Sequence, residues 1–137
     1  MYKNIYLWLG IGALIIIAIV VVSYYWGKSK VKPVQANYPD GGTGIPAGWK
    51  PEILANKLHE AMSGLGTFTG TKDNVWSEMY QLPTNDMFTA VYNVFNQLFV
   101  KENNGTLREW ISNETYYDYL SGVKGQLLTR FDSLNLI

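Results

Sequence analysis

Residues 88–99, FTAVYNVFNQLF, carry the strongest apolar stripe in the C-terminal part of the chain. Its members recur at helical intervals, which places them on one face of an α-helix; they are Phe88, Val91, Tyr92, Phe95, Leu98 and Phe99. Pro83 ends the preceding segment, and Thr84 or Asn85 caps the start of this helix. No run shows a convincing period of two, so the sequence predicts an all-α domain.

Helical spacing predicts four further helices in the same domain. The first begins at Pro51 and ends before Gly64, because proline suits a first turn and glycine a helix end. Thr71 caps the second helix. Thr106 and Glu109 form the capping box of a short fourth helix.

The fifth predicted helix begins at Ser112 or Asn113 and carries apolar residues almost to the C-terminal end of the sequence. Gly122 and Gly125 lie inside it, and they predict a kink or a break because glycine weakens helices. The five helices together define a predicted domain over residues 50–137.

The N-terminal segment has the features of a transmembrane helix. No charged side chain occurs between Lys3 and Lys28, and residues 5–26 form an apolar run of 22 residues flanked by aromatic side chains. As a helix this run spans roughly 33 Å, enough to cross a hydrocarbon core of about 30 Å. We therefore expect an anchor over residues 1–27 that contacts the bilayer through residues 5–26.

A buried core helix is one competing interpretation of this segment, but such a helix rarely stays uncharged for so long. A cleaved signal peptide is the other. It needs small residues at its cleavage site, whereas residues 23–26 are Ser-Tyr-Tyr-Trp. Lys28, Lys30 and Lys32 follow the run and only Lys3 precedes it, so the positive-inside rule favours a cytoplasmic C-terminal part.

Residues 28–49 have the composition of a Gly/Pro-rich linker. Prolines and glycines interrupt any apolar period, which is typical of turns and tethers. Tyr38, Ile45 and Trp49 are more apolar than a free tether needs, so we expect the last part of the linker to pack onto the domain.

Charge and composition exclude several classes of function. Residues 47–137 contain seven Lys and Arg against ten Asp and Glu, a net charge of −3. A mildly acidic domain without a basic cluster is unsuited to nucleic acid, whose phosphates supply most of the affinity. The absence of cysteine excludes disulfides, thiolate catalysis and cysteine-based metal sites. We expect neither a nucleic-acid partner nor a small-molecule substrate.

The glycines of residues 59–73, HEAMSGLGTFTGTKD, suit a phosphate cradle, a calcium loop or a tight helix corner. A P-loop requires Gly-Lys-Ser/Thr after a strand, whereas here Gly70 is followed by Thr71 and Lys72, and a helix precedes it. The dinucleotide fingerprint fails as well, because the spacing is G-x-G-x-x-x-G. The calcium loop and the helix corner remain.

Residues 62–67, Met-Ser-Gly-Leu-Gly-Thr, resemble the M-x-G-x-G-T loop that joins the first two helices of an annexin repeat. The predicted helices over about residues 50–134 agree with that five-helix unit in order and approximate length. Single repeats behind a Gly/Pro-rich segment and a membrane anchor also resemble small proteins of bacteriophages and mobile elements of Bacteroidetes-type hosts. We therefore expect one transmembrane helix and a compact five-helix annexin-repeat-like domain, in a bacterial inner membrane or the internal membrane of a virion.

The annexin resemblance implies a calcium ion that bridges loop carbonyls to phospholipid, with a carboxylate completing the site. The matching loop positions are Met62, Gly64 and Gly66. The carboxylate position falls on Trp110, and Glu109 is one residue away, about 100° around the helix. The candidate calcium ligands are therefore Met62, Gly64, Gly66 and Glu109. The alternative is that the glycines serve only to turn the chain between two helices. We expect no other metal and no cofactor.

The sequence offers little for catalysis. His59 is the sole histidine, and neither a nucleophile nor a carboxylate stands at a recognisable spacing from it. Pairs of acidic residues leave a glycosidase-like alternative; the candidates are Glu52, Glu60, Glu78, Glu109 and Asp118. We expect a non-enzymatic protein.

The domain has more aromatic side chains than a small core readily buries; they are Trp76, Tyr80, Phe88, Tyr92, Phe95, Phe99, Trp110, Tyr116, Tyr117, Tyr119 and Phe131. Core filling accounts for most of them, and a protein-contact surface for the surplus. The predicted function is a single-pass membrane-anchored structural protein that links the bilayer to a capsid protein, another protein or a second copy of itself. A calcium-dependent phospholipid-binding module and a membrane-tethered cell-wall hydrolase are the alternatives.

Overall fold

The structure is a computed structural model, and it describes residues 17–19, 32–63, 68–116 and 122–137. It contains two compact units, Met1–Lys32 and Pro33–Ile137. Nearly all of the predicted anchor lies outside the described residues, which include only the helical residues 17–19 from it. No helix within the described ranges has the length and apolar character needed to cross a bilayer.

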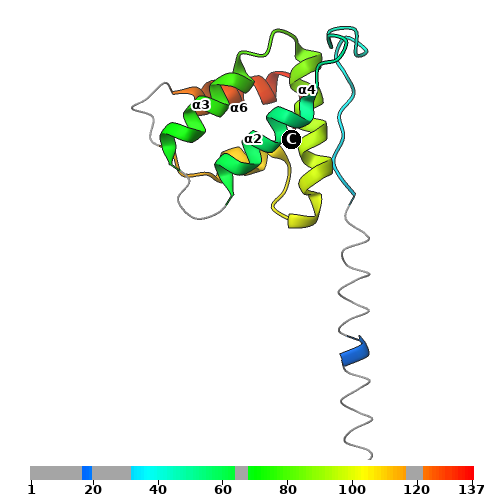
Figure 1. Ribbon diagram of the computed structural model, residues 1–137, viewed down its shortest axis with the longest axis vertical. Coiled ribbons are helices and arrows are strands. Elements are labelled where there is room, and N and C mark those ends of the chain that lie inside the picture. The colour runs from blue at the N-terminus through cyan, green and yellow to red at the C-terminus, as the bar shows by residue number, and fades with distance from the viewer. Residues whose placement is uncertain (1–16, 20–31, 64–67, 117–121) are drawn as a thin grey trace, which may run out of the picture. The chain divides into compact units, whose positions relative to one another are not determined.

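In the described part of the second unit, every regular element is a helix (Figure 1). α4 packs against α2 and α5, whereas α3 packs against α2 and α6, and α5 also contacts α6. The elements in chain order are α2 (Pro51–Met62), α3 (Thr69–Tyr80), α4 (Asn85–Phe99), the 3₁₀ helix η1 (Val100–Glu102), α5 (Leu107–Asn113) and α6 (Val123–Ser133). The prediction of an all-α domain is confirmed.

The core forms around the apolar stripe of α4. Phe88 meets Phe131 of α6 with ring centroids 4.8 Å apart, and Phe95 meets Trp110 of α5 at 5.5 Å in an edge-on arrangement. These aromatic contacts add to the burial of apolar surface that drives folding. The large side chains that are fully buried are Trp76, Tyr92, Phe88, Phe95, Phe131, Leu58, Met79, Leu107, Ile111, Leu127, Val91 and Val123.

Side-chain caps form at the helix starts where Thr is available. Thr84 accepts a hydrogen bond from the backbone N–H of Met87 at the start of α4. Thr106 and Glu109 form the predicted capping box of α5, with the Thr106 N–H donating to Glu109 Oε2 at 2.7 Å. Both caps satisfy backbone donors that a helix start leaves without partners.

Two predicted helix starts are wrong. α3 begins at Thr69 after Phe68, without a side-chain cap, rather than at Thr71. The predicted fifth helix is divided, because Ser112 and Asn113 end α5 and α6 begins only at Val123. Gly122 precedes α6 with φ +66°, a left-handed conformation that interrupts an α-helix and that glycine adopts readily.

Cationic side chains complete two helix ends. Arg130 of α6 donates to the carbonyls of Tyr80, Leu82 and Thr84, between the end of α3 and the start of α4. Lys124 donates to the carbonyls of Ser112 and Glu114 at the end of α5. The Tyr80 and Ser112 carbonyls lie in the last turns of α3 and α5, where a helix leaves carbonyls without intrahelical partners, so α6 fixes the ends of two other helices.

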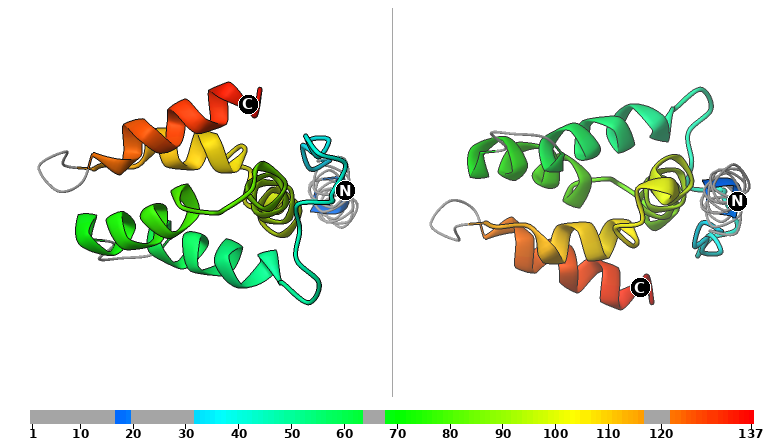
Figure 2. Two further views of the ribbon diagram at one scale, coloured as in Figure 1. Left: turned by 90° about the horizontal axis from the view of Figure 1, so that it is seen from above. Right: turned by 90° about the horizontal axis from the view of Figure 1, so that it is seen from below.

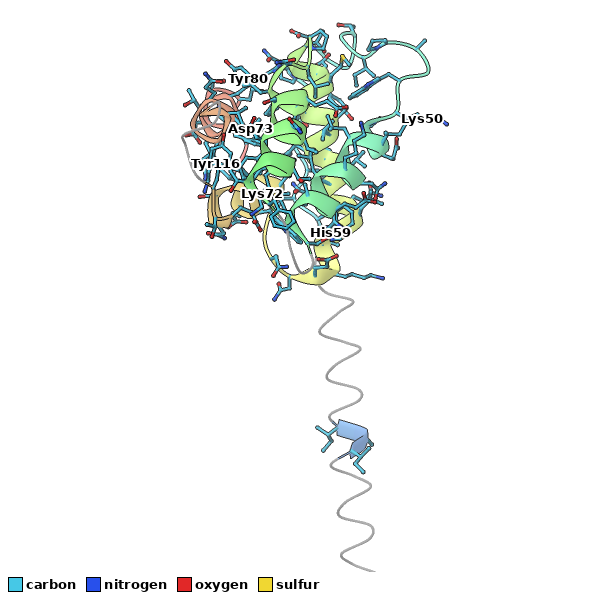
Figure 3. All side chains as sticks on the ribbon, turned by 60° about the vertical axis from the view of Figure 1, so that its left-hand side comes forward. Lys50, His59, Lys72, Asp73, Tyr80 and Tyr116 are labelled. Atoms are coloured by element: carbon cyan, nitrogen blue, oxygen red, sulfur yellow. The ribbon has the colours of Figure 1, made fainter. Side chains whose placement is uncertain are left out.

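Lys72 of α3 is buried, with only 3% of its surface exposed. Its Nζ lies 2.6 Å from Oε2 of Glu114 and donates to the carbonyl of Thr115. Beside it, the Tyr116 hydroxyl donates to Oδ1 of Asp73, and these side chains share one side of the domain (Figure 3). A buried ammonium requires such partners, so this cluster holds the segment after α5 against α3.

We predict that Gly105→Ala destabilises the domain by about 2 kcal/mol, the sum of a left-handed residue and a damaged cap. Gly105 has φ +86°, and an added Cβ would lie 2.2 Å from Oε2 of Glu109. The control is Gly125→Ala, an exposed helical position with open space around it, which should gain about 0.5–1 kcal/mol. Thermal unfolding of the full chain in detergent measures both. Equal stability of Gly105→Ala and wild type would contradict the left-handed conformation of Gly105 and its close approach to Glu109.

Candidate functional site

Residues 33–49, here called the strap, lie along α4 instead of forming a free tether. They belong to the same compact unit as the helices. Figure 2, which looks along α4, shows the strap on the side of α4 away from α3 and α6. The predicted linker is therefore part of the domain from Pro33 onward, and not only in the last part that the apolar residues indicated. Buried polar side chains of α4 hold them there.

Asp86, in the first turn of α4, has no exposed surface. Its Oδ1 accepts the backbone N–H of Asp40 at 2.8 Å, and its Oδ2 accepts that of Gly44 at 3.0 Å. Burial by itself would raise the pKa of Asp86. Hydrogen bonds from the backbone N–H groups of Asp40, Gly44 and Gly42 lower it by more than burial raises it, so the pKa lies below its ordinary value. The carboxylate therefore stays ionised near neutral pH, and its two oxygens fix one turn of the strap by accepting backbone N–H groups.

The strap turn over residues 40–44, Asp-Gly-Gly-Thr-Gly, owes its conformation around this carboxylate to its glycines. Gly41 and Gly42 have φ of +65° and +88°, which side chains rarely adopt. An added Cβ at Gly44 would lie 3.0 Å from Oγ1 of Thr84. That hydroxyl donates to the Gly44 carbonyl, so the same threonine caps α4 and binds the strap. Glycine is required here for conformation and for close approach.

Asn93 and Asn96 continue the attachment toward the end of α4. Asn93 Oδ1 accepts the N–H of Ala36 at 2.8 Å, and its Nδ2 donates to the Ala36 carbonyl at 2.9 Å. Asn96 Nδ2 donates to the carbonyl of Val34 at 3.0 Å, while its Oδ1 accepts the N–H of Leu107. All of these strap partners are backbone atoms. We name Asp86, Asn93 and Asn96 the clasp.

The clasp is the feature that sequence reasoning missed. Its three residues are seven and then three positions apart, so they share one face of the helix. A polar face on an amphipathic helix ordinarily faces water. The one available signal was the DGGTG turn, whose backbone N–H groups are free to converge on an anion.

The calcium candidates divide between described and undescribed residues. Gly64 and Gly66 lie outside the described residues. Met62 ends α2 with its side chain in the core. Glu109 accepts the Thr106 N–H in the capping box. Across the described ranges, no three His, Asp or Glu side chains are close enough together to share a metal ion.

Trp110, at the position that the annexin pattern reserves for the acid, is part of the core. It is 7% exposed and its ring lies 5.4 Å from that of His59. Its indole N–H is buried and has no hydrogen-bond acceptor. The side chain therefore fills space between α2, α4 and α5, as a core aromatic residue does.

His59 has a carboxylate partner that its sequence spacing did not reveal. Its Nε2 lies 2.7 Å from Oε1 of Glu102 on η1, and its ring stacks on Phe99 with centroids 3.8 Å apart. Ser63 Oγ is 3.4 Å from Nδ1, longer than the roughly 2.6–3.2 Å expected between an activated nucleophile and its base. The arrangement joins the end of α2 to η1 (Figure 3).

Most of the aromatic residues thought to be in surplus belong to the core. Of those in the described residues, Tyr80 is exposed and Phe99 and Tyr116 are half-buried. Tyr117 and Tyr119 lie outside the described residues. Phe68, which the sequence did not single out, is the most exposed aromatic side chain among the described residues, at 73%.

Comparison with known proteins returns no match: no protein family, no curated protein and no solved structure resembles this chain significantly.

We predict that Asn93→Ala destabilises the full chain by about 2–4 kcal/mol, because it removes both partners of the Ala36 peptide groups. Hydrogen exchange should show faster exchange of the Ala36 N–H, and denaturant unfolding should give the free-energy change. The matched control is Asn104→Ala in an exposed turn, expected within about 0.5 kcal/mol of wild type. Unchanged protection of Ala36 would show that the clasp does not hold the strap.

Acid should loosen the strap through Asp86. Its folded pKa is below the ordinary value of 3.8, so its ionised form contributes stability above about pH 4 that is lost as the pH falls through the folded pKa. The melting temperature of wild type should therefore fall more steeply below about pH 4 than that of Asp86→Asn. Asp132→Asn, in an exposed ion pair with Arg108, should keep the wild-type slope. Parallel curves for wild type and Asp86→Asn would refute the role of this carboxylate.

Proposed function

We propose that this chain is a single-pass membrane-anchored structural protein, non-enzymatic, whose helical domain is held close to a bilayer to bind a protein partner. The clasped strap is the observation that carries the proposal. A free tether lets a domain sample a wide volume, whereas the clasp attaches the chain to α4 from Val34 onward. Such a connection suits a spacer.

The length of chain between the predicted span and the domain limits how far the domain can lie from the membrane surface. The predicted span ends at Trp26 and the compact unit begins at Pro33. The seven peptide steps between them extend at most about 25 Å, at roughly 3.3–3.6 Å per residue. The domain is thereby limited to the neighbourhood of the membrane surface.

The buried or part-buried polar side chains of the described domain that form several hydrogen bonds support a structural role. Asp86, Asn93 and Asn96 bind the strap, whereas Lys72 and Arg130 bind backbone carbonyls of neighbouring segments. Catalytic groups in contrast converge on a site that a substrate can reach. In this proposal the partner is a capsid protein, another protein or a second copy, and the membrane is a bacterial inner membrane or the internal membrane of a virion.

The annexin-like calcium module is the competing proposal, and its chemistry differs in a way that can be tested. A calcium bridge to phospholipid is reversed by chelation, whereas a transmembrane helix is not. The Glu109 carboxylate that such a bridge would use already satisfies the start of α5.

We predict that the full chain stays in the membrane pellet after alkaline carbonate and after EGTA. Ala13→Arg combined with Ile16→Arg should release it, because each charge at the centre of a span costs about 2.5–3.5 kcal/mol. The control variant is Val34→Arg combined with Asn37→Arg on the strap, which should remain in the pellet. Release of wild type by carbonate would contradict the anchor, and release by EGTA alone would favour the calcium module.

A further inference from the structure

One end of the domain is distinguished by the start of the strap. Val34 is bonded to Asn96 in the last part of α4, and η1 continues from α4 at this end. Glu102 of η1 contacts His59 near the end of α2. Figures 1 and 3 show η1, the end of α2 and the start of the strap at the same end of the domain. We call it the entry end.

The entry end exposes apolar side chains beside a cation. Leu98 is 47% exposed and Val34 is 42% exposed, both near the end of α4. Phe68, just before α3, follows the end of α2 in the chain and is 73% exposed. Lys101 on η1 is exposed and has no acidic partner among the described residues. Exposed apolar residues together with an unpaired lysine are side chains that favour a membrane interface.

We infer that the entry end rests on the lipid headgroups, with Leu98, Val34 and Phe68 inserted among them and Lys101 near the phosphates. The inference rests on the proposed anchor and deepens it. The domain joins the predicted span through Pro33, within about 25 Å of chain. The chain that leads toward the predicted span therefore leaves the domain at the entry end.

A weak surface contact is sufficient in this geometry. A short connection gives the tethered domain an effective concentration on the order of millimolar at the membrane. Apolar side chains at a membrane interface are buried only about 5–10 Å into the boundary between headgroups and acyl chains, so exposed side chains on the surface of a folded domain can take part. The clasp fixes the point at which the chain leaves the domain, and this point lies at the entry end.

Fluorescence quenching in the full chain tests this contact, and the absence of cysteine permits single labels. Leu98→Cys and Phe68→Cys report on the entry end. Ile53→Cys is the matched control, since Ile53 is 59% exposed at the opposite end of α2. Each labelled chain is reconstituted in vesicles of phosphatidylcholine and phosphatidylglycerol that contain a headgroup-spin-labelled lipid.

The expected result is roughly threefold stronger quenching at Leu98 and Phe68 than at Ile53, because a headgroup layer only about 5–8 Å thick reaches one end of the domain. Lys101→Glu should weaken quenching at Leu98 in anionic vesicles and leave it unchanged in neutral ones. Equal quenching at Leu98 and Ile53 in a carbonate-resistant chain would overturn the contact while leaving the anchor intact. Release of the chain by carbonate would overturn both.

Discussion

The buried carboxylate of Asp86 is the group on which the arrangement of the domain depends. An ionised side chain without exposed surface is unfavourable unless hydrogen bonds replace its lost hydration. Here the replacement comes from backbone N–H groups of a turn more than forty residues earlier in the chain. The start of α4 and the strap therefore stabilise each other.

α4 joins two kinds of structure through its two faces. Its apolar stripe packs against α2, α5 and α6 and forms the core. Its opposite, polar face binds the strap by contacts to backbone atoms, which depend on the conformation of the strap more than on its side chains. A single helix thus determines both how the domain folds and how the chain enters it, which links stability to the proposed function as a spacer at a membrane.

The sequence predicted the features that depend on near neighbours. The stripe of α4, the Thr84 cap and the Thr106–Glu109 capping box all involve residues within a few positions of one another, and all are present, except that Leu98 of the stripe is 47% exposed. The clasp joins residues 42 to 62 positions apart, so periodicity shows only a polar helix face. The His59–Glu102 pair was missed for the same reason. The break predicted at Gly122 is present, because its left-handed conformation ends any continuous helix there, whereas Gly125 lies within α6.

Among possible tests, the distance between the strap and the body of the domain bears most directly on the clasp. Spin labels at Asn37 on the strap and Gln126 on α6, both exposed, can be introduced into the full chain without competing cysteines. Electron–electron double resonance in lipid nanodiscs then gives the distribution of distances between them. A clasped strap predicts one narrow distribution that broadens in Asn93→Ala. A broad distribution in wild type, unchanged by that substitution, would contradict the clasp and the spacer role built on it.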